Sequence, residues 1–179
     1  TLVAIISDHG HNIGIEPRDK GLASKQGHPM TRAVADLVLM VRHPKKQGAG
    51  KKCDKLVYNH DLTATMMSLM DVKPEQKMDG IDFWPAVVSG KKAREHVTIG
   101  WGPLVTVIDG EYWYNASIWG EEPLLYRYVS DPDLVKNIAK ANPKICKQML
   151  DKAVADAGGT IPESMKQFSG RPGCTPYKF

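Results

Sequence analysis

The sequence predicts an α/β layer followed by a smaller subdomain that contains an antiparallel sheet and one packed helix. Three observations support this class. An apolar strand over 2–6 and an amphipathic helix over 62–70 alternate with polar, glycine-containing loops. From residue 96 the pattern changes to short alternating strands, with an Asp-Gly turn at 109–110. A helix then begins at Pro143 and ends at Gly158-Gly159.

These changes divide the chain into three parts. We expect an α/β core over 1–95, a subdomain with an antiparallel sheet and a helix over 96–159, and an extended tail over 160–179. Within the subdomain, strands are predicted in the runs "HVTIGWG", "LVTVIDGEYWYNAS" and "LLYRY".

The first part contains three apolar runs and a helix. The run at 2–6 is apolar on both faces, which is typical of a central parallel strand, and further strands are predicted in 33–41 and 55–59. Because a central strand needs cover on both sides, we expect that a preceding part of the protein is not in this sequence. Asp61 is the predicted N-cap of the helix.

The composition is that of one globular domain with its own core. Of 179 residues, 42% are hydrophobic and 25% charged, and the formal net charge is +4. The densest basic run, 43–55, lacks interleaved aromatic residues and predicts a solvated loop, not a nucleic-acid surface. No apolar run approaches the roughly 18 residues of a membrane span. The three cysteines match neither a metal knuckle nor a disulfide framework and lie at Cys53, Cys146 and Cys174.

Asp8 and His9 directly follow the first strand. In α/β proteins, ligands bind beyond the carboxyl ends of the strands. Adjacent strand residues point to opposite faces, so both side chains reach one ion only if the chain bends, which Gly10 permits. A carboxylate with an imidazole suits a divalent cation. The alternative is that Asp8 caps the following turn and His9 packs beneath the loop.

Several segments, in the same order along residues 1 to about 157, resemble the C-terminal portion of type I sulfatases in the alkaline phosphatase superfamily. They are "SDHGHNIG", "GLASKQGHP", "ADLVLMVRHP", "YNHDLTATMMSLMDV", "MDGIDFWPAVVSG" and "PLLYRYVSDPDLVKNIAKANP". Their common order is more specific than any single motif. The resemblance implies the C-terminal part of an alkaline-phosphatase-like α/β/α sandwich, followed by the small subdomain.

The resemblance also implies roles for individual residues. Asp8 and His9 would be two ligands of the active-site divalent cation, for which Ca²⁺ is usual in sulfatases. Many members have Asn in place of His9, whereas His occurs in phosphonate monoester hydrolases and diesterases that often use Mn²⁺. We therefore expect Ca²⁺, with Mn²⁺, Mg²⁺ or Zn²⁺ as alternatives. Lys25 occupies the place of the lysine that contacts the sulfate oxygens, where a fixed ammonium stabilises developing negative charge.

Other residues are weaker candidates. The segment before Lys25 is longer than in the family, so Lys20 is a rival for the same role. His28 is a candidate to line the substrate pocket, although a loop histidine beside a proline is more often exposed. His11 is a candidate to orient Asp8 or contact substrate. His60 is interpreted as structural.

Two parts of a sulfatase site have no counterpart here. The chain contains no Asp-Asp dipeptide, and "CTPYK" at 174–178 differs from the family's Cys-x-Pro-x-Arg nucleophile motif because Lys178 replaces the arginine and no helix can follow. The resemblance therefore implies that the chain supplies half of the metal site without the formylglycine nucleophile. The expected partners are a missing N-terminal half of the catalytic domain and a small-molecule or saccharide sulfate ester. The parent is expected to be a sulfuric ester hydrolase, and the isolated chain is expected to be inactive.

Two other functions stay open. The parent could be a phosphonate monoester or phosphodiester hydrolase of the same superfamily, or the chain could be a non-catalytic sulfatase-fold domain that binds an anionic sugar. Tryptophans in the subdomain hint weakly at a sugar-facing surface and are more often core residues; they are Trp101, Trp113 and Trp119. Periplasmic, secreted and cytoplasmic locations are equally compatible with the sequence.

Overall fold

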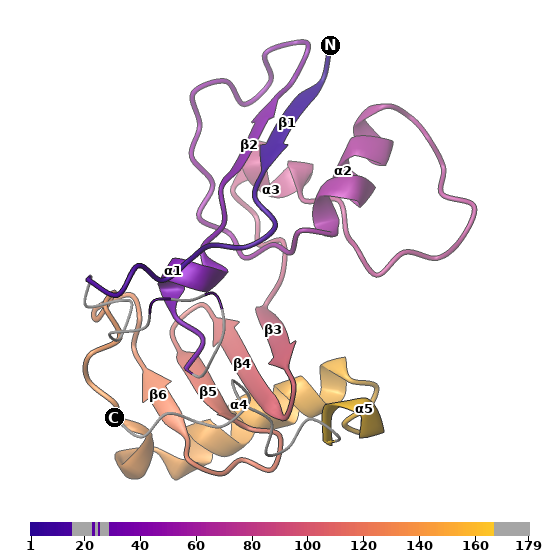
Figure 1. Cartoon of the computed structure of the whole chain (residues 1–179). Helices are drawn as coiled ribbons and strands as arrows, with labels where there is room; N and C mark the ends of the chain where they lie inside the picture. The colour runs from indigo at the N-terminus through magenta and orange to yellow at the C-terminus, as the bar shows by residue number, and fades with distance from the viewer. Residues whose placement is uncertain (16–22, 24, 26–28, 167–179) are drawn as a thin grey trace. The chain divides into compact units, whose positions relative to one another are not determined.

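The computed structural model describes residues 1–15, 23, 25 and 29–166 (Figure 1). Contacts within the chain define two compact units. The first contains Thr1–Asp8 and Leu37–Val97, and the second contains His9–Asp36 and Thr98–Phe179. The early segment His9–Asp36 therefore groups with the C-terminal sheet. The domain boundary near residue 95, which the sequence indicates, stays a prediction.

The first unit contains a two-stranded sheet. Strand β1 (Val3–Ile6) pairs with β2 (Leu39–Arg42) in antiparallel register, so that Ala4 lies opposite Val41. The prediction of a parallel arrangement is thus wrong for this pair, and in the described part of the chain no other strand pairs with β1. One face of this sheet carries the exposed apolar side chains of Val3, Ile5 and Met40, with Arg42 opposite Val3.

The predicted second strand over 33–41 is divided between two elements. Helix α1 (Arg32–Ala35) precedes β2, and an ion pair of 2.8 Å between Arg32 and Asp36 spans the helical turn. Periodicity alone does not separate a short buried helix from a strand, because both give a continuous apolar run.

Two helices cover the inner face of the β1–β2 sheet. Helix α2 (Asp61–Leu69) and α3 (Trp84–Ser89) contribute Leu62 and Trp84 to a small core. The predicted strand over 55–59 is absent from the described residues. Instead, the Tyr58 N–H donates to the Asp61 carboxylate at 2.7 Å, which makes this stretch a turn into α2.

Asp61 is the most connected polar residue of the first unit. It is the first residue of α2, not the predicted N-cap, and its side chain is fully buried. Its carboxylate accepts hydrogen bonds from Arg94 Nε at 2.9 Å and from the Ile81 N–H at 2.9 Å, besides that from Tyr58. Burial by itself would raise the pKa of Asp61, but the hydrogen bonds from Arg94, Tyr58 and Ile81 outweigh burial and lower it. The carboxylate therefore joins three segments as an anion.

The second unit is built on a four-stranded antiparallel sheet in the order β3-β4-β5-β6. The strands are β3 (His96–Trp101), β4 (Leu104–Asp109), β5 (Trp113–Ser117) and β6 (Leu124–Tyr126), as the sequence predicted for these runs. Ile108 pairs with Trp113, which places Gly110 and Glu111 at the centre of the hairpin turn, one residue later than predicted. Asp109 Oδ1 fixes this turn by accepting the N–H groups of Glu111 and Tyr112.

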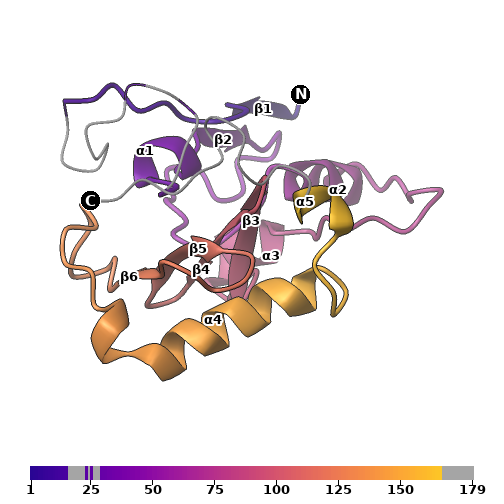
Figure 2. The ribbon, with the colours of Figure 1, turned by 60° about the horizontal axis from the view of Figure 1, so that its bottom comes forward.

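Helix α4 (Pro143–Asp156) lies along one face of this sheet (Figure 2). As predicted, it begins at Pro143 and ends before Gly158 and Gly159, which both have positive φ angles. A one-turn 3₁₀ helix, η2 (Ala139–Ala141), precedes it. The predicted extended tail contains a short helix, α5 (Glu163–Lys166), and the residues after 166 lie outside the described ones.

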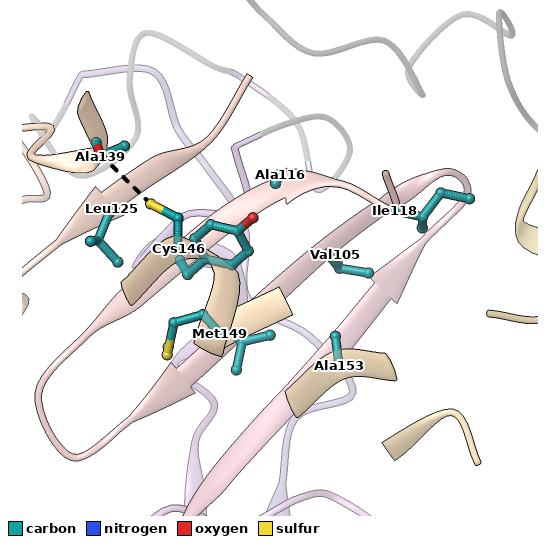
Figure 3. Packing of buried hydrophobic residues seen from close by; sticks show 10 residues of the cluster. Val105, Ala116, Ile118, Leu125, Ala139, Cys146, Met149 and Ala153 are labelled. Atoms are coloured by element: carbon teal, nitrogen blue, oxygen red, sulfur yellow. Dashed lines mark hydrogen bonds between the residues drawn. The ribbon is translucent and has the colours of Figure 1, made fainter. Parts of the chain in front are cut away.

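Cys146 belongs to the core between α4 and the sheet (Figure 3). Its sulfur lies 3.8 Å from the Ala139 carbonyl oxygen, alongside Met149 and Leu125. Burial raises the pKa of the Cys146 thiol, which disfavours the nucleophilic thiolate. Cys146 is thus a packing residue, and Cys53 is exposed and unpaired.

No helix in the described ranges is long and apolar enough to cross a lipid bilayer.

Replacing the Asp61 carboxylate should destabilise the chain in a pH-dependent way. Asp61→Asn keeps the shape but removes the buried negative charge that faces the Arg94 guanidinium, and we expect it to lower the free energy of unfolding by about 3 kcal/mol at pH 7. Because the pKa of Asp61 is lower in the folded than in the unfolded chain, its stabilising contribution is complete above the ordinary value of 3.8. It is lost as pH falls through the lowered value, so the difference between variant and wild type should shrink.

Urea unfolding at pH 7 and at about pH 3 measures this difference. The matched control is Asp54→Asn, because Asp54 pairs with Lys55 at 2.7 Å but is 88% exposed, and it should cost far less than the Asp61 substitution. Equal costs for the two substitutions, or an Asp61 cost that is the same at both pH values, would contradict the assigned role of Asp61.

Candidate functional site

Asp8 follows β1 and is held by main-chain contacts of the first unit. The preceding residue, Ser7, donates its N–H to the Val38 carbonyl at 3.0 Å, and its hydroxyl accepts the Val38 N–H at 3.1 Å. The side-chain amide of Asn59 donates to the Asp8 carbonyl oxygen at 3.0 Å. These bonds fix the Asp8 backbone beside β2 and the turn before α2. The residue itself is exposed, which suits a group that binds an ion from solution.

His9 belongs to the second unit, where the imidazole contacts Lys25. His9 Nδ1 lies 2.6 Å from the Gly10 carbonyl oxygen, and His9 Nε2 lies 3.2 Å from Lys25 Nζ. With Nδ1–H donating to the carbonyl, the neutral imidazole presents its lone pair at Nε2, and the Lys25 ammonium donates to it. The structure therefore brings together two candidate residues that are separated by sixteen positions in the chain.

The donor atoms fit part of a metal coordination shell. An imidazole whose other nitrogen is held by a carbonyl is the usual form of a metal-ligating histidine, and a carboxylate is a typical partner for hard divalent cations. Among the described residues, no three His, Cys, Asp or Glu side chains form a cluster that could hold a metal ion. The boundary between the two units falls between Asp8 and His9, so Asp8 belongs to the first unit and His9 to the second.

The loop that carries His9 and Lys25 is tied to helix α1 at Gly10. The Gly10 N–H donates to the Val34 carbonyl at 2.9 Å, which ties the residue after His9 to helix α1. A Cβ atom at Gly10 would lie only 2.0 Å from the Ala33 carbonyl oxygen. Glycine is thus required here by close backbone contact, in addition to the bend that the sequence suggested.

A second, buried contact lies next to this junction. The Thr31 hydroxyl donates to Asn12 Oδ1, and both residues are fully or almost fully buried. Neither role could be predicted from the sequence, because a polar residue in a glycine-containing loop is ordinarily solvated. Their burial becomes intelligible only once the loop is placed against the C-terminal sheet.

Strand β5 holds the same loop through Met30. The Met30 N–H donates to Asn115 Oδ1 at 3.0 Å, and Trp113 Nε1 donates to the Met30 carbonyl oxygen at 3.1 Å. Thr106 on β4 donates its hydroxyl to Asn115 Oδ1 at 2.6 Å. The segment next to α1 therefore contacts the sheet face opposite α4 (Figure 2).

Of the other candidate residues, His11 and His60 lie among the described residues. His11 is exposed, and His60 stacks on the Tyr58 ring with 4.7 Å between ring centroids. His28, Lys20 and Cys174 lie outside the described residues.

The three subdomain tryptophans differ in burial. Trp113 is 1% exposed and is a core residue, as a buried strand position would suggest. Trp101 and Trp119 are 36% and 51% exposed.

The sequence matches no family model and no curated protein. Solved structures, however, match almost the whole chain. A putative sulfatase from Bacteroides thetaiotaomicron VPI-5482 is 20% identical, with a TM-score of 0.67 over 93% of this chain. A 2-O GAG sulfatase is 19% identical, with a TM-score of 0.68 over 100% of this chain. A protein solved in complex with its substrate D-glucosamine-2-N,6-O-disulfate is 16% identical, with a TM-score of 0.72 over 93% of this chain.

This chain covers only 40%, 42% and 36% of the lengths of those three structures. It has the fold of the C-terminal portion of sulfatases, so the predicted fold class is confirmed. The mixed helices and antiparallel sheets of the chain match that region of the solved structures.

Filling the space beside Gly10 should disturb the loop junction. Gly10→Ala places a methyl group against the Ala33 carbonyl, and we expect a loss of about 2 kcal/mol in the free energy of unfolding. Gly110→Ala is the matched control, because a Cβ at Gly110 meets nothing within 4 Å, and it should change stability by less than about 0.5 kcal/mol. Denaturant unfolding of both variants checks this, and equal costs would rule out the close contact at Gly10.

Proposed function

We propose that this chain is the C-terminal portion of a metal-dependent sulfatase that hydrolyses sulfate esters. The observation that carries the proposal is the contact between His9 Nε2 and Lys25 Nζ, in a fold shared with sulfatases. A potential metal ligand and a cation suited to binding an anion thus lie together on one loop. The family resemblance assigns these same residues to the metal and to the sulfate group.

Asp8 and His9 would hold a divalent cation, with Ca²⁺ as the proposed ion and Mn²⁺, Mg²⁺ or Zn²⁺ as alternatives. A cation bound there would act as a Lewis acid on a sulfate oxygen. Lys25 would contribute a fixed positive charge that stabilises the sulfuryl group and the leaving oxygen as the S–O bond breaks. Both roles require the bound cation and the Lys25 ammonium to lie within reach of the same anionic group.

The His9–Lys25 contact also indicates how the two roles are separated. A neutral imidazole has one lone pair, which here accepts a hydrogen bond from Lys25. That lone pair cannot bind Lys25 and a metal ion at once. On this proposal His9 Nε2 would serve the metal ion and the Lys25 ammonium would serve the anionic ligand, while the Gly10 carbonyl keeps the imidazole ring oriented.

The proposed substrate is a sulfated saccharide. One structural neighbour is described as a 2-O GAG sulfatase, and another was solved with D-glucosamine-2-N,6-O-disulfate as its substrate. The rest of the catalytic domain, including the nucleophile and the remaining metal ligands, would come from an N-terminal half that joins this chain. On this proposal the isolated chain does not turn over substrate.

A second candidate function is suggested by His9. Histidine at this position is a feature of phosphonate monoester and phosphodiester hydrolases in the same superfamily. Rates on 4-nitrophenyl sulfate and on the matching phosphate diester, measured with the complete enzyme, separate the two activities. Faster hydrolysis of the diester would favour this second candidate.

Substitutions at the two roles should affect different measurements. In the complete enzyme, Asp8→Ala should weaken Ca²⁺ binding by at least about tenfold, because a ligand is lost. Lys25→Ala should not weaken Ca²⁺ binding, because it removes a group that competes for His9 Nε2. It should lower kcat on 4-nitrophenyl sulfate by about 10²–10³-fold, because it removes charge stabilisation at the transition state. Calorimetric Ca²⁺ titration and steady-state kinetics measure the two effects.

The control is Lys45→Ala, which removes an exposed lysine from the basic loop and should change neither quantity. Unchanged metal affinity in Asp8→Ala would favour a non-catalytic binding domain. Sulfatase activity from the 179-residue chain alone would overturn the half-site assignment.

A further inference from the structure

We infer that Asn115 and Trp113 on β5 are positioning residues that hold the loop bearing His9 and Lys25 in its binding geometry. The inference rests on the proposed function, because it assigns the C-terminal sheet a role in the same site. Neither residue contacts His9 or Lys25 in the described contacts. Their effect would be transmitted through the main chain of Met30.

The loop is closed at its base by contacts between its two limbs. One limb leaves His9 through Gly10 and Asn12, and the other returns from Lys25 through Met30 and Thr31. The Gly10 N–H bonds to the Val34 carbonyl, and the Thr31 hydroxyl bonds to Asn12 Oδ1. These bonds keep the two limbs together, but they do not attach the loop to another part of the fold.

That attachment is made by β5 on both polar groups of Met30. Asn115 accepts the Met30 N–H and Trp113 donates to the Met30 carbonyl, at 3.0 and 3.1 Å. The two β5 residues are separated by one position, so their side chains project from the same face of the strand. Both are almost completely buried, and the main chain of Met30 is therefore fixed by two bonds shielded from water.

The hydrogen-bond pattern of Asn115 indicates that its acceptor atom is the functional one. Oδ1 receives both the Met30 N–H and the Thr106 hydroxyl. Nδ2 is buried and has no hydrogen-bond partner among the described residues. Turning the amide over would place a donor against the Met30 N–H, so the unpaired Nδ2 is the cost of presenting Oδ1 to the loop.

The first test measures amide hydrogen exchange in the 179-residue chain by NMR. Asn115→Ala should accelerate exchange of the Met30 amide by at least about tenfold, because its acceptor is lost, while β4 amides keep their protection. Thr106→Val is the matched control, since it removes a buried hydroxyl from the same sheet face but leaves the Asn115–Met30 bond. It should leave Met30 exchange within about threefold of wild type.

Trp113→Phe is a second variant that keeps the test possible if Asn115→Ala does not fold. It removes the Nε1–H donor while keeping an aromatic ring in the core, and it should also accelerate exchange in the segment around Met30. Unchanged exchange at Met30 in a folded Asn115→Ala chain, or in folded Trp113→Phe if Asn115→Ala does not fold, would overturn the inference.

The second test separates positioning from simple structural support. Mn²⁺ added to the chain should broaden the NMR signals of His9 and Lys25, since paramagnetic broadening falls steeply with distance. In Asn115→Ala, or in Trp113→Phe if that is the variant that folds, broadening at Lys25 should fall severalfold relative to His9, while Thr106→Val keeps the wild-type ratio. If the Met30 amide exchanges freely in the variant but the ratio of broadening at Lys25 to that at His9 is unchanged, β5 stabilises the loop without positioning it. That result would overturn the assignment of Asn115 and Trp113 as positioning residues.

The two tests also distinguish failure of the inference from failure of the proposed function. If Mn²⁺ broadens neither residue in the wild-type chain, Asp8 and His9 do not hold the ion without the N-terminal half, and positioning toward a metal in this chain is overturned. Hydrogen exchange would then still decide whether β5 holds the loop.

Discussion

The fastening of the Met30 main chain to β5 is the interaction on which the second unit depends. Met30 is separated from Trp113 by 83 positions and from Asn115 by 85 positions in the chain. These bonds therefore bring an early segment onto a sheet built from the C-terminal part of the sequence. The β4–β5 hairpin is buried on both faces: α4 packs on one, and Met30 contacts the other at Trp113 and Asn115. Because the residues of β4 and β5 are buried on both faces, this hairpin needs cover on both sides. Helix α4 follows the hairpin in the sequence, whereas Met30 comes from far upstream.

In the first unit, distant segments are held together by a buried charge instead of by a cover on a sheet. Its strands span four residues each and its apolar core centres on Leu62, Phe83 and Trp84, so little hydrophobic surface is available to hold its loops. The buried Asp61 carboxylate compensates by joining the turn at Tyr58, the segment at Ile81 and the side chain of Arg94. Charge-assisted bonds are stronger and more directional than apolar contacts, and they suit a unit made of short elements. The same choice makes the unit sensitive to acid.

Much of the fold could be predicted because the information was local. The β4–β5 hairpin, the α4 helix with its proline start and glycine end, and the burial of Trp113 follow from alternation, turn chemistry and helix signals within a few residues. The antiparallel pairing of β1 with β2 could not be predicted, because strand direction is decided by connections and not by composition. Likewise, the turn at Tyr58 depends on a carboxylate that is engaged by distant partners.

The candidate site divides along the same line. Asp8, His9 and Lys25 were selected by resemblance to sulfatases, and the structure adds the His9–Lys25 contact. The residues that hold this loop could not be predicted, because Asn12, Thr31 and Asn115 are small polar side chains, which are ordinarily solvated. In the structure Asn115 accepts a main-chain N–H, and Asn12 and Thr31 bond to each other, all in buried positions. Burial is a property of the tertiary fold. Distant polar contacts of this kind leave no periodic signal in a sequence.

The exposed face of the β1–β2 sheet has a practical consequence for anyone who prepares this chain. Val3, Ile5 and Met40 present an apolar surface, and within the described residues the outer edge of β1 has unpaired backbone groups. Two copies can satisfy such edges by pairing with each other, so self-association competes with the monomer as protein concentration rises. Dilute refolding, or co-expression with a polypeptide that covers this edge, would favour the monomeric or the assembled form over aggregates.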